Sequence, residues 1–179
     1  SAFPELQVLN LSDSGIDEIK GHGFKPVSKL RVVDLRGCPV TQFPRDVFEG
    51  LQDLQAVFAD NYKLCCPATL PDTFNLNHCL APSDEISSCD ALLRSDVYRV
   101  MLAVFAALAL LGNVSSLLYR VVSKVASNSG FAVFVTHLCV SDLLMGVYLA
   151  TIGVADRLYL GTYLWQDTTW KASTACQVA

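Results

Sequence analysis

The chain lacks the residue patterns that catalysis and nucleic-acid binding require. Only three histidines occur among its 179 residues, and they are scattered over different regions. Because no nucleophile–base set, metal-ligand cluster or phosphate-binding loop stands out, an enzyme is the least expected class of protein. Thirteen basic side chains against seventeen acidic ones give a net charge of −4. A balance of this sign provides no basic surface for nucleic acid.

The start of the chain lacks a signal peptide, and its end lacks a stop signal. No basic segment followed by a short apolar run opens the sequence, as a signal peptide would require. Ser1 lies inside what resembles a sequence repeat, and the last residues, 176–179, contain no stop signal. We therefore expect that both ends are truncations of a longer protein.

Charged side chains are nearly absent from two long stretches of the second half. Between Val100 and Leu118 there is none, and this run of about nineteen residues is long enough to cross the hydrocarbon core of a bilayer. A second apolar run extends from Phe131 to about Ala155 and measures more than ~30 Å as a helix, at ~1.5 Å per residue. A soluble domain of this size cannot cover such helices on all sides. The sequence therefore predicts two membrane-spanning helices.

The remaining charges predict the orientation of these helices. Arg120 and Lys124 are the only charges in the segment between the two runs, whereas the opposite ends carry charges of both signs. Because short loops with an excess of Lys and Arg stay in the cytoplasm, this segment is predicted to be cytoplasmic and the N-terminal part extracellular. Four cysteines cluster just before the first run, where an extracellular location favours disulfides.

A leucine pattern repeats in the first 66 residues. The pattern L-x-x-L-x-L begins at Leu6 and returns 24 positions later at Leu30. A third, looser copy is assigned to Leu51 and the residues after it. This spacing is typical of leucine-rich repeats, in which each repeat contributes one short strand and buries its apolar face only by stacking on its neighbours. The predicted core consists of Leu6, Leu9, Leu11, Leu30, Val33, Leu35, Leu51 and Leu54, with Phe24, Phe43 and Phe48 behind it and Cys38 as a buried thiol.

The residues between the leucines are predicted to lie on a concave face, where such repeats commonly bind partners. They are Gln7, Val8, Asn10, Arg31, Val32, Asp34, Gln52, Asp53 and Gln55. A solvated polar surface is the alternative interpretation of the same residues. Asn10-Leu11-Ser12 is a glycosylation sequon, so Asn10 is a candidate for modification on this face.

A segment without helix or strand periodicity follows the repeats. It is rich in proline, Asp, Asn and Ser, which predicts an irregular hinge that its cysteines hold together. The four candidates allow three disulfide pairings, which the sequence leaves open, although two adjacent cysteines are expected to reach different partners. Ser95 or Asp96 is predicted to cap the first long helix. The disulfide candidates are Cys65, Cys66, Cys79 and Cys89.

Asp142 lies near the middle of the second apolar run. A charged group at that depth costs roughly 2.5–3.5 kcal/mol on insertion, so its side chain is expected to face a polar interior. Asn113, at a similar depth in the first run, is its natural partner. The two residues predict an ion site, a proton site or a buried polar network.

These residues carry a resemblance to a known family. Gly112–Asn113 in the first predicted membrane helix, with Leu138–Asp142 in the second, resembles rhodopsin-like G-protein-coupled receptors. Leucine-rich repeats and a cysteine-bearing hinge narrow the resemblance to the leucine-rich-repeat-containing receptors. Leu144–Leu149 resembles the relaxin receptor branch most, as do the spacing of residues 156–163 and the hinge residues 86–93.

The resemblance implies a function and several site residues. It implies a receptor in the plasma membrane that binds a peptide or protein hormone on its repeats and signals through a heterotrimeric G protein. Asn113 and Asp142 belong to an interior polar network that commonly holds a sodium ion in this superfamily. Cys176 matches the cysteine that bridges to the second outer loop. The candidate relay residues in the hinge are Ile86, Ser87, Ser88, Leu92 and Leu93.

The expected fold is the end of a leucine-rich-repeat α/β solenoid, followed by the first two helices of an all-α seven-helix transmembrane bundle. The rival interpretations are a leucine-rich adhesion or scaffold protein with a membrane anchor, and a transporter. An anchor leaves Asp142 unexplained, and a transporter does not suit a repeat ectodomain. The predicted parts are repeats over 1–66, a hinge over 67–96 and a transmembrane region over 97–179, with helices over about 97–122 and 131–155, a cytoplasmic loop over about 123–130, an extracellular loop over about 156–175 and the start of a third helix.

Overall fold

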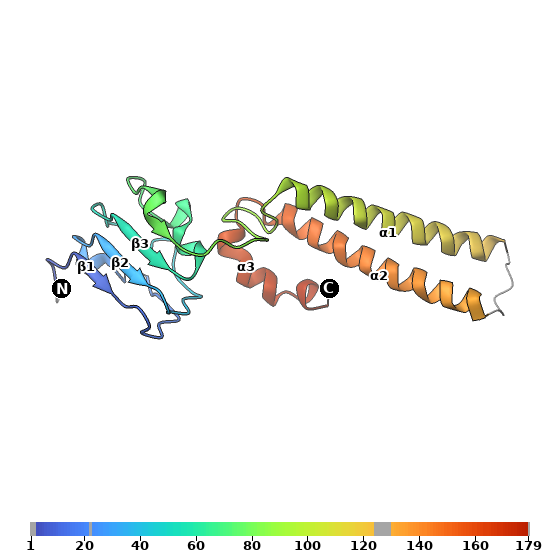
Figure 1. Ribbon diagram of the computed structural model, residues 1–179, viewed down its shortest axis with the longest axis horizontal. Helices are drawn as coiled ribbons and strands as arrows, with labels where there is room; N and C mark the ends of the chain where they lie inside the picture. The colour runs from blue at the N-terminus through green and yellow to red at the C-terminus, as the bar shows by residue number, and fades with distance from the viewer. Residues whose placement is uncertain (1–2, 22, 124–129, 179) are drawn as a thin grey trace. The chain divides into compact units, whose positions relative to one another are not determined.

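The chain forms two compact units, Ser1–Glu85 and Ile86–Ala179. Figure 1 shows the computed structural model, which describes residues 3–21, 23–123 and 130–178. The division between the units falls inside the segment predicted as one hinge. Residues 67–85 therefore belong to the first unit, and residues 86–96 belong to the unit with the long helices.

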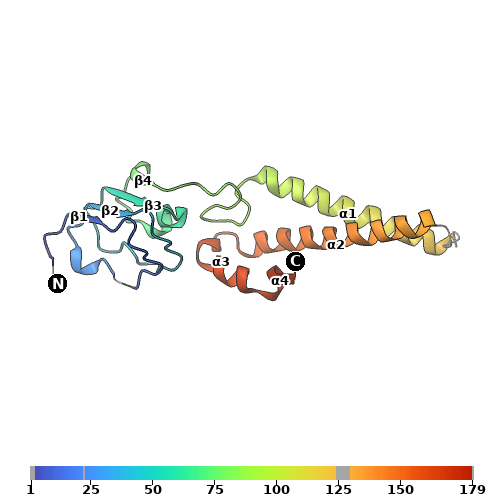
Figure 2. The same cartoon turned by 60° about the horizontal axis from the view of Figure 1, so that its bottom comes forward.

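The first unit is built on a parallel β-sheet. In the described part of the chain it has four strands, hydrogen-bonded in chain order: β1 (Val8–Asn10), β2 (Val32–Leu35), β3 (Ala56–Ala59) and β4 (Cys79–Leu80). Val8 pairs with Val32 and Val32 with Ala56, so the register repeats the sequence period of 24 positions, from 8 to 32 and from 32 to 56. Figure 2 shows the strands on one side of this unit and the connecting segments on the other.

The third strand lies three residues later than the sequence pattern predicted. The register places Leu54, not Leu51, level with Leu30. Leu51 is fully buried, but in the segment that precedes β3. The assignment of Gln52 and Asp53 to the strand face was therefore wrong, and the aromatic residue Phe58 occupies that face instead. A leucine at each of the two candidate positions had made the pattern ambiguous.

The core of this unit is formed by the inward residues of stacked strands and by the segments behind them. Phe24 and Phe48 stack with their ring centroids 5.6 Å apart. The thiol of Cys38 is buried and donates to the carbonyl of Leu11 over 3.0 Å, so this cysteine is a packed residue, as predicted. Of the predicted core, Leu30, Val33, Leu35, Leu51, Leu54, Phe24 and Phe48 are buried, while Leu6, Leu9, Leu11 and Phe43 pack against them partly exposed.

Side-chain hydrogen bonds join successive turns of this unit. The N–H of Gly37, whose φ of +71° suits glycine, donates to the Asp60 carboxylate over 2.7 Å. Asn61 donates from Nδ2 to the carbonyl of Val40 over 2.8 Å and accepts from the N–H of Lys63. Each bond connects residues more than twenty positions apart or caps a helical turn, so neighbouring repeats are held by polar as well as apolar contacts.

The first part of the predicted hinge is more regular than its composition suggested. Short 3₁₀ helices follow β3, and β4 then adds a fourth parallel strand to the sheet. A disulfide joins Cys65 to Cys79, with 5.5 Å between the Cα atoms. The prediction of an irregular segment was wrong for these residues because a two-residue strand leaves no alternation to detect. The short helices are η1 (Lys25–Val27), η2 (Tyr62–Cys65), η3 (Pro67–Thr69) and η4 (Leu76–His78).

Two long helices dominate the second unit. α1 (Asp96–Val122) starts where the Ser95 side chain accepts the N–H of Val97 over 3.2 Å, which confirms one of the two predicted caps. α2 (Gly130–Leu158) runs beyond the predicted end at residue 155. Both helices are long and apolar enough to cross a membrane. Most of the predicted cytoplasmic loop, residues 124–129 with Lys124, lies outside the described residues.

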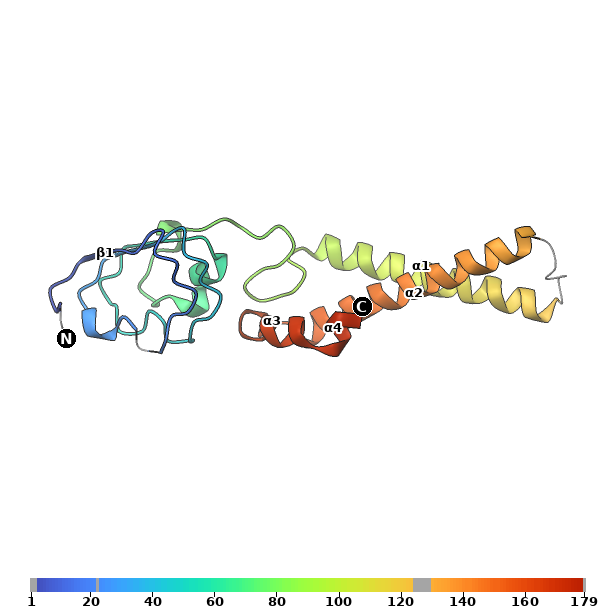
Figure 3. The same cartoon turned by 90° about the horizontal axis from the view of Figure 1, so that it is seen from below.

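α1 and α2 pack side by side, as Figures 1 and 3 show. A glycine permits a close approach: a Cβ atom on Gly146 would lie 3.0 Å from the side chain of Leu110 and 3.1 Å from that of Ala109. Gly153 lies equally close to Leu102. Small residues of this kind let helix backbones approach in membranes.

The predicted outer loop over 156–175 is largely helical. α3 (Tyr163–Ala172) follows the end of α2 after a turn at Gly161, and α4 (Thr174–Val178) stands where the third long helix was expected to start. α3 combines polar residues with aromatic ones, and only its packing against the end of α2 shows which side is buried. The extracellular placement of this loop stays a prediction.

The close approach at Gly146 gives a first prediction. Gly146→Leu forces a large side chain against Ala109 and Leu110, and overpacking of this kind costs about 1–3 kcal/mol. We expect a lower midpoint of thermal unfolding for the chain in detergent, followed by tryptophan fluorescence. Gly112→Leu is the matched control, because a Cβ there meets nothing within 4 Å. Equal midpoints for the two variants would show that the helices do not meet at Gly146.

Candidate functional site

A buried carboxylate near the end of α2 is the centre of the second unit. Asp156 is 1% exposed. Its Oδ1 accepts the backbone N–H of Leu93 over 2.8 Å, and its Oδ2 accepts Nε of Arg99 over 2.8 Å. Asp156 therefore contacts both the chain segment before α1 and the first turn of α1, although these lie about sixty residues earlier in the sequence.

Arg99 completes the arrangement around Leu93. Its Nη2 donates to the carbonyl of Leu93 over 2.8 Å, and its Nη1 donates to Asp96 over 2.5 Å. The backbone of Leu93 is thus held at both its N–H, by Asp156, and its C=O, by Arg99. Hydrogen bonds to charged groups are about twice as strong as neutral ones, particularly away from water. We call the group formed by Leu93, Arg99 and Asp156 the Leu93 clamp.

An apolar cluster holds the neighbouring residue. Leu92 packs against a cluster in which Ala155, Tyr163 and Trp170 are buried. The rings of Tyr159 and Trp170 lie 5.9 Å apart at an angle of 54°. The side chain of Leu92 and the backbone of Leu93 therefore fix the same short segment to α2 and α3 by two different kinds of contact.

The rest of the candidate relay segment folds into a closed loop. Arg94 donates its N–H to the carbonyl of Ile86 over 2.7 Å. Ser88 exchanges hydrogen bonds with Ala91, and the N–H of Gly161, just after α2, donates to the carbonyl of Asp90 over 2.6 Å. Ile86 is 63% exposed at the start of this loop, whereas Ser87 and Leu93 are buried. The structure thus brings all five candidate relay residues together beside the ends of α1 and α2.

Sequence reasoning missed the role of Asp156 and Arg99. Arg99 had been counted only as a charge flanking the helices, and Asp156 as such a charge and as part of the spacing over 156–163. The available signal was the position of Asp156, in the last turns of an apolar helix, together with a basic residue in the first turn of the other helix. Nothing in the sequence indicated that the two residues face each other.

The opposite end of the helix pair has a second arginine contact. Nη1 of Arg120, near the end of α1, donates to the carbonyl of Ala132 over 2.8 Å and to Oγ1 of Thr136 over 3.2 Å. Ala132 and Thr136 both lie in the first turns of α2. Arg120 had been used in the sequence only to orient the helices, and the structure shows that it also joins them.

The two polar residues in the middle of the helices are not joined in the described part of the chain. Nδ2 of Asn113 donates to the carbonyl of Ala109 in its own helix over 2.8 Å. Asp142 lies on the exposed surface of the α1–α2 pair. Among the described residues no group of three or more His, Cys, Asp or Glu side chains is arranged to hold a metal ion. The shared network of Asn113 and Asp142 stays a prediction.

The cysteines divide into two groups. Besides Cys65 and Cys79, both Cys66 and Cys89 are in disulfides. The adjacent residues Cys65 and Cys66 therefore have different partners. Three cysteines are free thiols, namely Cys38, Cys139 and Cys176.

The exposed face of the sheet in the first unit combines apolar and charged groups. Asp34 on β2 binds Nε and Nη2 of Arg36, and the Arg36 guanidinium lies over the ring of Phe58 at 5.1 Å. The hydrogen bonds from Arg36 hold the pKa of Asp34 below its ordinary value, so this carboxylate is charged at neutral pH. Exposed Val8 and Leu80 lie on the flanking strands.

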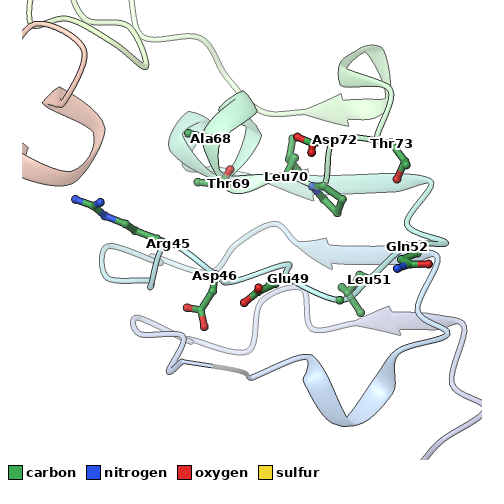
Figure 4. Close-up of a pocket in the computed structure, with 12 residues that line it drawn as sticks. Arg45, Asp46, Glu49, Leu51, Gln52, Ala68, Thr69, Leu70, Asp72 and Thr73 are labelled. Carbon is green, nitrogen blue, oxygen red and sulfur yellow. The ribbon is translucent and has the colours of Figure 1, made fainter.

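A groove on the first unit is lined by acidic, polar and apolar side chains. It has a volume of about 660 Å³ between residues 45–52 and 68–73. Figure 4 shows Asp46 and Glu49 on one side of it and Thr69, Leu70 and Asp72 on the other. Its acidic groups do not form a metal-binding set among the described residues.

Several known receptors are similar to this chain in sequence. The G-protein coupled receptor GRL101 of Lymnaea stagnalis is 38% identical over 133 residues, which is 74% of this chain and 11% of that protein. Relaxin receptor 2 of Canis lupus familiaris is 30% identical over 74% of this chain and 17% of that receptor. Human relaxin receptor 1 is 34% identical over 58% of this chain and 14% of that receptor. No family model matches the chain.

The chain matches a segment of the relaxin-receptor-like, leucine-rich-repeat-containing G-protein-coupled receptors. It spans only 11% and 17% of the length of the first two relatives. The similarity confirms the family that the motifs indicated. These relatives are receptors and not enzymes, and with the two long apolar helices they place the segment in the plasma membrane, with the repeats outside.

The Leu93 clamp of this receptor segment gives a second prediction. Asp156→Asn replaces the carboxylate, so Asp96 is left as the charged partner of Arg99 and the charge-assisted bond from Arg99 to residue 156 is lost. We expect faster amide hydrogen exchange at Leu93 and its neighbours, measured by mass spectrometry on the chain in detergent. Arg157→Gln is the control, because it removes an exposed charge at the next position. Unchanged exchange in Asp156→Asn would show that the clamp does not hold the segment.

Proposed function

We propose that the chain is the part of a G-protein-coupled receptor that passes hormone binding from the extracellular repeats to the transmembrane helices. One observation carries the proposal: both polar groups of the Leu93 backbone are bound by charged side chains, one from α1 and one from α2. A hinge residue attached to two membrane helices is the arrangement that a mechanical relay requires.

The ligand is a peptide or protein hormone in this proposal. The 24-residue register of the parallel sheet supports a leucine-rich-repeat solenoid, whose exposed face suits a protein partner. That face offers the charged pair of Asp34 and Arg36 beside the aromatic ring of Phe58. Aromatic and arginine side chains are enriched where protein partners bind tightly. The similar receptors are named after relaxin, which agrees with a peptide or protein hormone as the ligand.

The relay works by shifting an equilibrium between two packings of the helices. A hormone changes that equilibrium only through a difference in affinity for the two states. Because Arg99 and Asp156 bind the backbone of the same residue, Leu93, movement of residues 86–93 changes the contact between the outer ends of α1 and α2. Arg120 ties the cytoplasmic ends, so a displacement at the outer ends changes the angle between the helices.

The receptor function also requires partners and parts beyond this segment. We propose a heterotrimeric G protein as the cytoplasmic partner, and a disulfide from Cys176 to a cysteine in a second outer loop. Cys176 is a half-buried free thiol beside the cluster of Tyr163 and Trp170, which suits that pairing. The alternative is an adhesion or scaffold protein of the same repeat type, without G-protein signalling.

A cell assay of the full-length receptor tests the relay. Asp156→Asn is compared with the wild type and with Arg157→Gln at equal surface expression, with relaxin as the probe hormone. We expect the response of a G-protein energy-transfer sensor to require about five- to 150-fold more hormone, the range of typical coupling energies. Binding of labelled relaxin to the repeats stays within about threefold.

The assay distinguishes the relay from the receptor function as a whole. A normal response in Asp156→Asn contradicts the relay but not the receptor. A receptor that engages no G-protein sensor, with relaxin or in its basal state, favours the adhesion alternative.

We also propose that Asp142 contributes to a sodium site in the intact bundle. Asp142 supplies a carboxylate and Asn113 an amide oxygen, and the remaining oxygen ligands would come from helices other than α1 and α2. We expect the thermal midpoint of the full-length receptor to be higher in sodium chloride than in choline chloride. The difference disappears in Asp142→Asn and persists in Asp96→Asn, which removes an exposed acid. A sodium effect that survives Asp142→Asn rules out this site.

A further inference from the structure

We propose that Asn10 carries an N-linked glycan that rises from the exposed face of the sheet at β1. The proposal concerns the surface of the first unit and does not depend on the relay. The sequon Asn10-Leu11-Ser12 begins at the last residue of β1, and Asn10 and Ser12 are accessible while Leu11 packs toward the core. Strand alternation thus directs the asparagine away from the protein interior.

The local hydrogen bonds fix which atom of Asn10 is available. Its Oδ1 accepts the N–H of Ser12 over 2.9 Å and the hydroxyl of Ser12 over 2.7 Å. Only the oxygen of a carboxamide can accept an N–H, so Nδ2 is the other atom of the group. The turn therefore presents the amide nitrogen, which is the atom that a glycan joins, while its oxygen is held by the third residue of the sequon.

Transfer of a glycan to Asn10 requires one co-reactant. A lipid-linked oligosaccharide supplies the sugar. Nδ2 of Asn10 forms a bond to the anomeric carbon, the bond from that carbon to the lipid diphosphate breaks, and one amide proton is lost. The diphosphate leaves with the electron pair, so no oxidant or reductant is needed. The extracellular placement of the repeats exposes this site to the compartment in which such transfer occurs.

The chain contains a matched negative control. Asn113-Val114-Ser115 has the same spacing but lies within α1. Its Nδ2 donates to the carbonyl of Ala109, and Ser115 donates to the carbonyl of Leu111. Both sequon side chains are turned to the helix backbone inside the membrane-spanning segment, where glycan transfer has no access.

A glycan at Asn10 limits where a protein partner can dock. Asn10 pairs in register with Asp34 on the next strand, and exposed Val8 lies two residues before it on the same face. A branched sugar covers β1 and this valine. Contact with a protein partner on the sheet then falls on β2 and β3, where Asp34 and Phe58 lie.

The test is glycopeptide analysis of the full-length receptor recovered from the surface of mammalian cells. We expect the peptide that contains Asn10 to carry a glycan and to yield Asp at this position after treatment with peptide-N-glycosidase. Asn10→Asp, which keeps an oxygen to accept from Ser12, removes one glycan from the receptor, seen as a mobility shift. Ser12→Thr retains it, and Asn113→Gln leaves the mobility unchanged.

Two results overturn the proposal. One is an unmodified Asn10 peptide as the main form in the surface receptor, which needs no variant and is independent of folding. The other is a mobility shift in Asn113→Gln that is absent in Asn10→Asp. Neither result bears on the relay through Asp156, so failure of one proposal is distinguishable from failure of the other.

Discussion

The carboxylate of Asp156 is the group on which the organisation of the helical unit depends. Burial of a carboxylate is costly unless hydrogen bonds and a cation replace the water that it loses. Here Arg99 supplies the cation and Leu93 supplies a backbone N–H. Because the arginine also binds the carbonyl of Leu93, satisfying one charge fixes the chain segment before α1, the start of α1 and the end of α2 together. The closed loop of residues 86–94 and the cluster around Trp170 form beside this point.

Two features keep the helix pair close, one between its ends and one at the end far from Asp156. Gly146 allows the backbones to approach where a larger side chain would separate them, and Arg120 binds Ala132 and Thr136 at the cytoplasmic end. An arginine that binds the partner helix can also orient the helices in the membrane, since its charge stays near the membrane surface. The pair therefore has a charged contact at each end and small residues between them.

The sequence predicted the parts that depend on composition and period, and it missed those that depend on single distant contacts. Long apolar runs identified α1 and α2, and leucine spacing identified β1 and β2, because many residues contribute to each signal. The third strand was misplaced because Leu51 and Leu54 both fit the pattern, and only pairing with β2 decides between them. The Arg99–Asp156 contact left no local pattern, since either charge alone is compatible with a solvated helix end.

The two units differ in how their structure can respond to a partner. In the first unit stacked strands share a core of many buried residues, so the loss of one contact is spread over neighbours. In the second unit the segment before α1 is held by fewer contacts, including the packing of Leu92 and the hydrogen bonds of the Leu93 clamp, and local structures held by few contacts open most easily. Because the clamp joins Leu93 to both long helices, its opening removes the same contact from α1 and from α2 at once.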